Sequence, residues 1–318
     1  MRIAILGATS QIARDLIQSF SARSEHEWVL YTRRPEAVAQ WLADVGLARR
    51  HTVAAFEAFA KDQPFDAILN FVGVGNPAQA VAMGASIFDV TAEYDEMALR
   101  HVRRHPACRY LFLSSGAAYG SGFDAPADAH TTAAIAINNL QPQDWYGAAK
   151  LHAECRHRAL ADLPIVDIRV FNYFSRTNDL GARFFITDIL RAVRDQTTMH
   201  TTPNYMRRDF LGPRDFQQIV SCILAAPEQN LAVDCYTRAP IDKQEILSLM
   251  QQHFGLRYQM GLAPADVPSA TGAKPHYYSL SRRAADLGYQ PTQSSADNLV
   301  EEATALLAGD FHSCLQNK

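Results

Sequence analysis

The fold is decided by the stretch Arg2-Ile-Ala-Ile-Leu-Gly-Ala-Thr-Ser-Gln-Ile-Ala13, which lies at the start of the 318-residue chain. Residues 2–6 form a short apolar run, which predicts a buried strand. Apolar residues then recur at helical spacing from Ile12 to Phe20, which predicts a helix. A turn of small residues joins the two. The stretch therefore predicts a strand that passes through a tight turn into a helix.

Strand-like and helix-like segments continue to alternate along the first 171 residues. Such alternation is typical of parallel β-α-β units, so we expect an α/β fold with a Rossmann-type doubly wound parallel sheet. After residue 171 the pattern changes to turn-rich segments and isolated helices. The sequence therefore predicts one domain over 1–171, to which 211–236 returns, and a smaller C-terminal lobe built from 172–210 and 237–318.

The composition argues against several classes of protein. Thirty Lys and Arg stand against 33 Asp and Glu, a net charge of −3, so the basic surface of a nucleic-acid-binding protein is not expected. No apolar run approaches the length of about 18 residues that a membrane span needs, and no signal segment is evident. Five cysteines without a C-x-x-C pair favour reduced thiols and a cytoplasmic location. His101 and His105 have zinc-like spacing but lack a third ligand, so no metal site is predicted.

The turn after the first strand has the features of a phosphate-binding loop. Small residues let the backbone approach a pyrophosphate, which the N-terminus of the next helix would hold through free N–H groups and the helix dipole. The alternative is a plain turn with Ser10 as a helix cap, because two of the three usual glycines are replaced. If the loop binds a dinucleotide, the expected contacts in it are Gly7, Thr9, Ser10, Gln11 and Ile12.

The end of the second strand indicates which dinucleotide. A carboxylate at this position would bind a ribose 2′-hydroxyl, and here the strand ends in Thr32-Arg33-Arg34. The guanidiniums of Arg33 and Arg34 offer forked donors for a 2′-phosphate instead. The sequence therefore favours NADP(H) over NAD(H), with a solvated basic loop as the alternative.

Two later segments carry groups that can move a proton. Tyr146 and Lys150 are four residues apart, so they share a face of a helix. A cation beside a phenol lowers its pKa, so we expect Tyr146 to exchange a proton with an alcohol or sugar oxygen near neutral pH. Ser115, at the end of a predicted strand, can hydrogen-bond to the same oxygen. The pair alone is weak evidence, because Tyr and Lys at this spacing occur often by chance.

Together these elements resemble the extended short-chain dehydrogenase/reductase family of NAD-dependent epimerases and dehydratases, in its nucleotide-sugar-modifying branch. Two later segments, Arg207-Arg208-Asp-Phe-Leu and Tyr278 to Pro291, resemble stretches of nucleotide-sugar epimerases, dehydratases and reductases. The earlier motifs stand in the family's order: the Gly7 loop, Asn70-Phe-Val-Gly73, Ser114-Ser115 with Tyr119-Gly120, Tyr146 with Lys150, and Arg169-Val-Phe-Asn172.

The resemblance implies roles for individual residues. Ser115 and Tyr146 would be the catalytic pair, and Lys150 would hold the nicotinamide ribose. Tyr146 and Lys150 would thus also contact the cofactor, together with Phe71, Val72 and Gly73. Asn172, Arg208 and Lys274 would bind a nucleotide diphosphate sugar, in the C-terminal lobe. The alternatives are that Arg208 pairs with Asp209 or Asp215, and that Lys274 is a solvated loop lysine.

The resemblance also narrows the reaction. The 4,6-dehydratases carry Asp-Glu where this chain has Gly116-Ala117, and the epimerase-reductases that make fucose carry a cysteine at the position of Gly116. We therefore expect NADPH-dependent reduction of a nucleotide-activated 4-keto-6-deoxy sugar by a homodimer. A nucleotide-sugar 4-epimerase with retained NAD(P) is one alternative. A catalytically silent NADP-binding sensor is another, against which the intact Ser115, Tyr146 and Lys150 argue.

Overall fold

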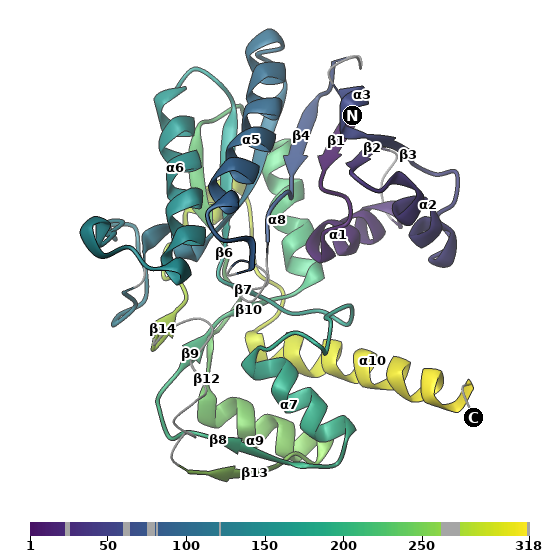
Figure 1. Cartoon of the computed structure of the whole chain (residues 1–318), viewed down its shortest axis with the longest axis vertical. Helices are drawn as coiled ribbons and strands as arrows, with labels where there is room; N and C mark the ends of the chain where they lie inside the picture. Colours follow the sequence, from purple (N-terminus) through teal and green to yellow (C-terminus); the bar gives the residue numbers. More distant parts are fainter. Residues whose placement is uncertain are drawn as a thin grey trace.

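The computed structural model describes residues 1–22, 26–59, 64–74, 80, 82–120, 122–261 and 274–316. At its centre is a seven-stranded parallel sheet in the order β11-β6-β5-β4-β1-β2-β3 (Figure 1). The chain runs from β1 to one edge and then returns to β4 and continues to the other edge, so the predicted doubly wound sheet is confirmed. The strands are β1 (Arg2–Leu6), β2 (Glu27–Thr32), β3 (Thr52–Ala55), β4 (Ala67–Asn70), β5 (Arg109–Ser115), β6 (Ile165–Val170) and β11 (Leu231–Asp234).

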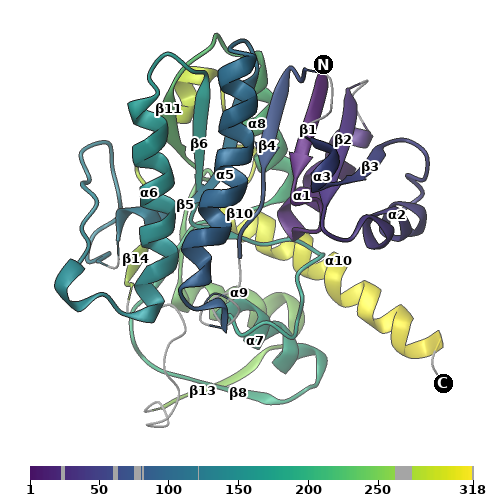
Figure 2. The same cartoon turned by 45° about the horizontal axis from the view of Figure 1, so that its top comes forward.

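Helices cover both faces of this sheet, because both faces of its strands are apolar. On β1, Ile3 and Ile5 pack with α1, α2 and α8, whereas Ala4 and Leu6 pack with α3, α5 and α6. Figure 2 shows α5 and α6 side by side on one face. These helices are α1 (Gln11–Ser21), α2 (Pro35–Asp44), α3 (Phe56–Phe59), α5 (Ser86–Arg104), α6 (Trp145–Ala159) and α8 (Pro213–Ala225).

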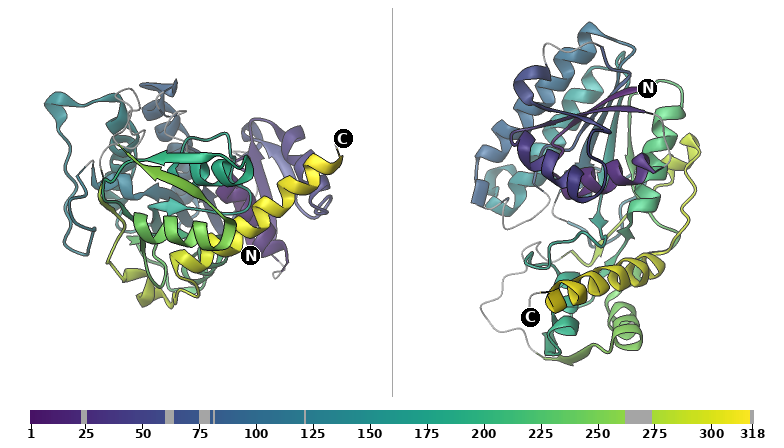
Figure 3. Two further views of the ribbon diagram at one scale, coloured as in Figure 1. Left: turned by 90° about the horizontal axis from the view of Figure 1, so that it is seen from below. Right: turned by 90° about the vertical axis from the view of Figure 1, so that its right-hand side faces the viewer.

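A smaller lobe with its own apolar core lies beyond the carboxyl ends of the sheet strands (Figure 1). Its helices are α7 (Phe185–Arg194), α9 (Lys243–Phe254) and α10 (Ser295–Gln316), and α10 runs across the lobe (Figure 3). Its paired strands are β8 (Thr198–Thr201) with β13 (Arg257–Met260), and β12 (Ile241–Asp242) with β9 (Arg207–Arg208) and β14 (His276–Tyr277). Between sheet and lobe, β7 (Asn172–Tyr173) pairs with β10 (Phe210–Leu211). Four short 3-10 turns complete the described elements: η1 (Gly116–Tyr119), η2 (Ile137–Asn139), η3 (Pro142–Asp144) and η4 (Arg283–Leu287).

Buried polar contacts join the lobe to the sheet. Asp15 on α1 accepts hydrogen bonds from Tyr173 Oη at 2.9 Å and from Thr177 Oγ1 at 2.8 Å. Arg176, on the same loop, pairs with Glu302 of α10 at 2.7 Å. The loop after β7 is thus held by α1 through Asp15 and by α10 through Glu302. Within the described residues, no helix combines the length and apolarity needed to cross a membrane.

Candidate active site

The turn after β1 lies against the end of β4, where the strand order reverses. Gly7 has a φ of 84°, and a Cβ built on it would stand 2.9 Å from the backbone nitrogen of Val72 and 3.0 Å from the carbonyl carbon of Phe71. A larger residue would therefore push the two loops apart and strain the backbone. Doubly wound sheets bind their ligands at such reversal points. Gly7, Phe71 and Val72 thus meet at the expected place for a dinucleotide.

The side chains of this turn differ in their contacts. Ser10 is the N-cap residue of α1, yet its side chain makes no capping hydrogen bond, so capping does not explain the serine. Gln11 is turned toward the smaller lobe, where its Nε2 donates to Ser175 Oγ at 3.0 Å. Gln11 can therefore offer a bound phosphate its backbone N–H rather than its side chain. Thr9 and Ile12 are half-buried in the same turn.

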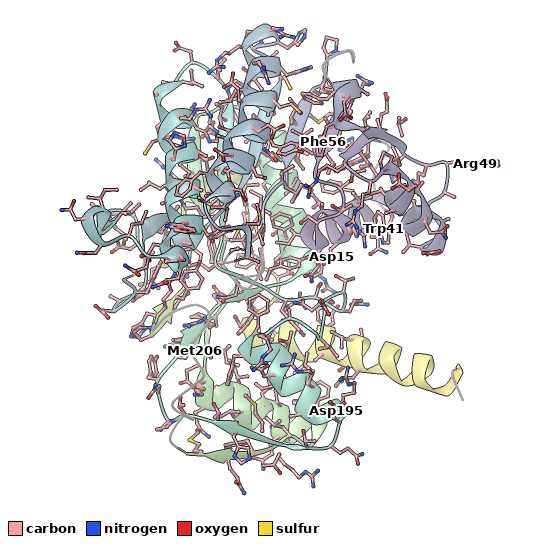
Figure 4. The ribbon with its side chains drawn as sticks, in the orientation of Figure 1. Asp15, Trp41, Arg49, Phe56, Asp195 and Met206 are labelled. Carbon is pink, nitrogen blue, oxygen red and sulfur yellow. The ribbon has the colours of Figure 1, made fainter. Side chains whose placement is uncertain are left out.

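Three arginines gather at the end of β2. Arg33 and Arg34 are exposed there. Burial lowers the pKa of Arg14 on α1, and the charge of Arg34 lowers that pKa further. The buried Nε of Arg14 has no hydrogen-bond partner among the described residues, and its guanidinium lies 5.2 Å from the ring centroid of Trp41. Figure 4 labels Trp41 on α2. Sequence analysis missed Arg14, because only the fold shows that the first turns of α1 face the end of β2.

The three predicted catalytic residues meet at the end of β5. Ser115 is the last residue of β5, and Tyr146 and Lys150 lie one turn apart on α6. Ser115 Oγ accepts from the backbone nitrogen of Ala117 at 3.2 Å, and Ser115 is the polar neighbour that acts on the Tyr146 phenol. Lys150 Nζ donates to the carbonyl oxygen of Leu113 at 2.7 Å and lies 5.9 Å from the ring centroid of Tyr146. A hydroxyl, a phenol and an ammonium are therefore within reach of one small ligand group.

The expectation that Lys150 lowers the pKa of Tyr146 is wrong for this structure. Burial raises the pKa of the Tyr146 phenol, and the neighbouring Ser115 hydroxyl offsets only part of that rise. Burial also lowers the pKa of Lys150 to about 8, against the raising effect of three buried carboxylates. The physical reason is orientation, since the ammonium is directed at Leu113 and at the space beside Gly73, where a built Cβ would lie 3.5 Å from Nζ.

Arg208 and Lys274 lie together in the smaller lobe. Arg208 Nη1 donates to the carbonyl oxygen of Lys274 at 2.7 Å. The suggested pairing of Arg208 with Asp209 or Asp215 is wrong, because Asp209 accepts from Thr237 and Ser295 and Asp215 accepts from Thr292. Burial lowers the pKa of Arg208 to about 10 and also lowers that of Lys274, on which Arg208 acts in the same direction. Lys274 is therefore not a solvated loop lysine, and the two cations form no ion pair with a carboxylate of the described chain.

Asn172, which the resemblance assigns to the nucleotide sugar, makes two contacts with the backbone. Its Nδ2 donates to the carbonyl oxygens of Tyr277, at 3.2 Å, and Asp209, at 3.3 Å, so the side chain fastens β7 to β14 and to the residue that follows β9. This contact brings in Tyr277, which sequence analysis missed. The Oη of Tyr277 lies 3.2 Å from Ser115 Oγ. Its only sequence signal is a position next to the matched segment that begins at Tyr278.

The chain matches the model of a known protein family. The model of the NAD dependent epimerase/dehydratase family matches residues 3–236. The chain belongs to this family. The resemblance drawn from the motifs is thereby confirmed. No curated protein sequence matches the chain. The described residues contain no group of three or more side chains that could hold a metal ion.

Solved structures of this family share the fold over nearly the whole chain. UDP-glucuronic acid 4-epimerase from Bacillus cereus, in complex with UDP-glucuronic acid and NAD, has a TM-score of 0.76 at 16% identity and covers 97% of this chain and 99% of its own. UDP-glucose 4-epimerase from Thermotoga maritima, with UDP-glucose, has a TM-score of 0.77 at 15% identity, with 98% and 100% covered. dTDP-glucose 4,6-dehydratase from Bacillus anthracis, with NAD, has a TM-score of 0.76 at 12% identity, with 98% of each chain covered.

Proposed function

We propose that the protein is an NADPH-dependent reductase of a nucleotide-activated 4-keto-6-deoxy sugar. The observation that carries the choice of cofactor is the cluster of Arg14, Arg33 and Arg34 at the end of β2, where no carboxylate ends the strand. A 2′-phosphate distinguishes NADPH from NADH, and guanidiniums bind phosphate through paired hydrogen bonds. The close approach at Gly7 suits the pyrophosphate of the same molecule.

The substrate class follows from the smaller lobe. Arg208 and Lys274 form a half-buried pair of cations that lacks a carboxylate partner in the described chain. A diphosphate supplies the charge that such a pair needs. The structural neighbours bound to UDP-glucuronic acid and UDP-glucose support a nucleotide sugar as the ligand.

The catalytic residues suit reduction of a carbonyl. A nicotinamide dinucleotide, when bound, supplies the hydride. Tyr146 keeps its proton at neutral pH, because burial raises the pKa of its phenol, and it gives this proton to the carbonyl oxygen. Ser115 hydrogen-bonds to the same oxygen and holds it in place. Lys150 uses one of its three N–H donors on Leu113, which leaves donors for the ribose hydroxyls.

A nucleotide-sugar 4-epimerase is the second candidate, because the B. cereus and T. maritima neighbours have that activity. An epimerase first oxidises its substrate, so its tyrosine must begin by accepting a proton. The raised pKa of Tyr146 and the arginines at the end of β2 both favour net reduction over this reaction. Elimination, as in the B. anthracis dehydratase, lacks acid and base groups at Gly116 and Ala117.

The test is a pair of assays on the purified chain. In the first, UDP-, GDP-, CDP- and dTDP-linked 4-keto-6-deoxy sugars are offered with NADPH or NADH, and loss of the reduced cofactor is followed. We expect one nucleotide series to be reduced, with NADPH preferred by about tenfold or more. In the second, UDP-glucose is incubated without added cofactor. Formation of its 4-epimer there, with no reduction in the first assay, would establish the epimerase instead.

A further inference from the structure

A second tyrosine reaches the serine of the proposed site from the smaller lobe. Tyr277, on β14, has its Oη 3.2 Å from Ser115 Oγ. The Tyr277 ring is fixed by Phe123 and Phe171, whose centroids lie 4.8 Å and 5.2 Å from its own. Burial raises the pKa of Tyr277, so its phenol is protonated at neutral pH and is a hydrogen-bond donor.

The same ring lies against the cations of the smaller lobe. Lys274 Nζ is 4.9 Å and the Arg208 guanidinium 5.8 Å from the Tyr277 ring centroid. Cations within about 6 Å of a ring are attracted by its electron-rich face. Tyr277 therefore has two separable parts, a ring that holds Arg208 and Lys274 and a hydroxyl that contacts Ser115.

The hydroxyl of Ser115 has one proton to donate and two lone pairs to fill. The backbone N–H of Ala117 fills one lone pair. If Tyr277 donates to the other, both lone pairs are filled and the proton of Ser115 is left for a third partner. In the proposed reaction that partner is the carbonyl oxygen of the sugar.

We propose that Tyr277 is a positioning residue for the reaction: its hydroxyl directs the proton of Ser115 toward the substrate carbonyl, and its ring holds the cations that would bind a diphosphate. The inference rests on the proposed function, because both the reaction and the diphosphate belong to it. Without the Tyr277 hydroxyl, one lone pair of Ser115 is vacant, and the Ser115 hydroxyl can turn its proton away from the carbonyl. Loss of the hydroxyl should therefore slow turnover without weakening binding.

Two substitutions separate the two parts of the side chain. Tyr277→Phe keeps the ring, so kcat should fall about five- to tenfold for one lost hydrogen bond, with the KM for the nucleotide sugar unchanged. Calorimetry should give the same Kd for the nucleoside diphosphate as in the unmodified protein. Tyr277→Leu also removes the ring, so this Kd should rise about five- to tenfold as well. The matched control is Tyr278→Phe at the next position of the chain. The Tyr278 ring centroid lies 5.9 Å from the Arg207 guanidinium, and the substitution should leave all three quantities unchanged.

The outcomes distinguish this inference from the function on which it rests. If the unmodified protein binds a nucleoside diphosphate and reduces its keto-sugar, but Tyr277→Phe has the same kcat, the positioning role is wrong and the proposed function stands. If Tyr277→Phe raises KM and Kd as much as it lowers kcat, Tyr277 is a ligand contact and not a positioning residue. If the unmodified protein neither binds a nucleoside diphosphate nor reduces any of the four keto-sugars, the proposed function fails and this inference fails with it.

Discussion

In the proposed reduction, Tyr146 is the proton donor. Burial raises the pKa of its phenol, and Lys150, whose ammonium points to Leu113, does not reverse this. A group that holds its proton is suited to donate it as a carbonyl is reduced. Sequence spacing placed Tyr146 and Lys150 on one face of a helix, but only the three-dimensional contacts show where each polar end points.

Replacing Tyr146 by phenylalanine tests this role. Tyr146→Phe keeps the ring and removes the proton, so kcat for keto-sugar reduction should fall by about 10²-fold or more while KM changes little. Steady-state kinetics on the purified variant measure both constants. Tyr258→Phe is the control, because Tyr258 lies on β13, which pairs with β8 in the smaller lobe, and its Oη accepts from Gln244 Nε2 at 3.3 Å. Normal turnover by Tyr146→Phe would mean that another group donates the proton.

A second prediction concerns the arginines at the end of β2. Changing Arg33 and Arg34 together to alanine removes two forked donors, so the preference for NADPH over NADH, at least about tenfold in the unmodified protein, should disappear. The Kd of each cofactor can be measured by fluorescence titration. The affinity for NADH should stay constant, since NADH has no 2′-phosphate. Equal affinities for the two cofactors before any substitution would contradict the assignment.

At the level of elements, a buried imidazole joins α5, α6 and β6. His157 lies between Asp95 Oδ1 at 2.7 Å and Asp167 Oδ1 at 2.6 Å, and all three side chains are fully buried. Burial alone would lower the pKa of His157, but the two carboxylates outweigh it and raise the pKa to about 9. The α6 helix also carries Tyr146 and Lys150, so the buried ion pairs help to hold these two residues in place against the sheet.

The pH dependence of stability follows from that shift. A histidine whose folded pKa is raised from 6.5 to about 9 contributes stability that is complete below pH 6.5 and is lost as the pH rises through about 9. The contribution is at most on the order of 3 kcal/mol. Thermal unfolding should therefore show a fall in Tm over this range that is smaller in His157→Gln. His152→Gln, on the exposed face of the same helix, should retain the full fall, and an identical fall in His157→Gln would contradict the account.

The elements that the sequence predicted best are those with a local pattern. The strand and helix on either side of Gly7, and the helix that carries Tyr146, follow from periodicity and turn residues, and the structure has them at β1, α1 and α6. Tyr277 and Arg14 were missed because each acts through a partner far away in the chain. Asn172 was found in the sequence as part of a motif, but the motif did not show that its side-chain amide donates hydrogen bonds to backbone oxygens.

For the whole molecule, the two lobes divide the proposed ligands between them. The sheet carries Gly7 and the arginines of β2, and the smaller lobe carries Arg208 and Lys274. Binding energy from a diphosphate in the second lobe can position a sugar near Ser115, so it should appear in turnover as well as in affinity. The contacts of Asp15 with Tyr173 and Thr177 help to hold the smaller lobe in place against the sheet, so that the two proposed ligands can meet.

Substitution of Arg208 tests whether the smaller lobe binds the diphosphate. Arg208→Ala should weaken binding of the nucleoside diphosphate by about 1.5–3 kcal/mol, the range for hydrogen bonds to charged groups, and leave NADPH affinity unchanged. Calorimetric titration with UDP, GDP, CDP and dTDP measures the first effect, and titration with NADPH measures the second. The Arg33 and Arg34 double variant is the matched control, because it should show the opposite pattern. If Arg208→Ala leaves diphosphate binding unchanged, the assignment of the diphosphate to the smaller lobe is wrong.

The central claim is net hydride transfer from NADPH to the sugar, and its most direct measurement is isotopic. The purified protein is given NADPH that carries deuterium at the transferable position of the nicotinamide, together with the nucleotide-activated 4-keto-6-deoxy sugar that it binds. Mass spectrometry and NMR of the product should show one deuterium at C4 for each NADPH consumed. Interconversion of nucleotide sugars at C4 without consumption of NADPH, or a product without deuterium, would contradict the account.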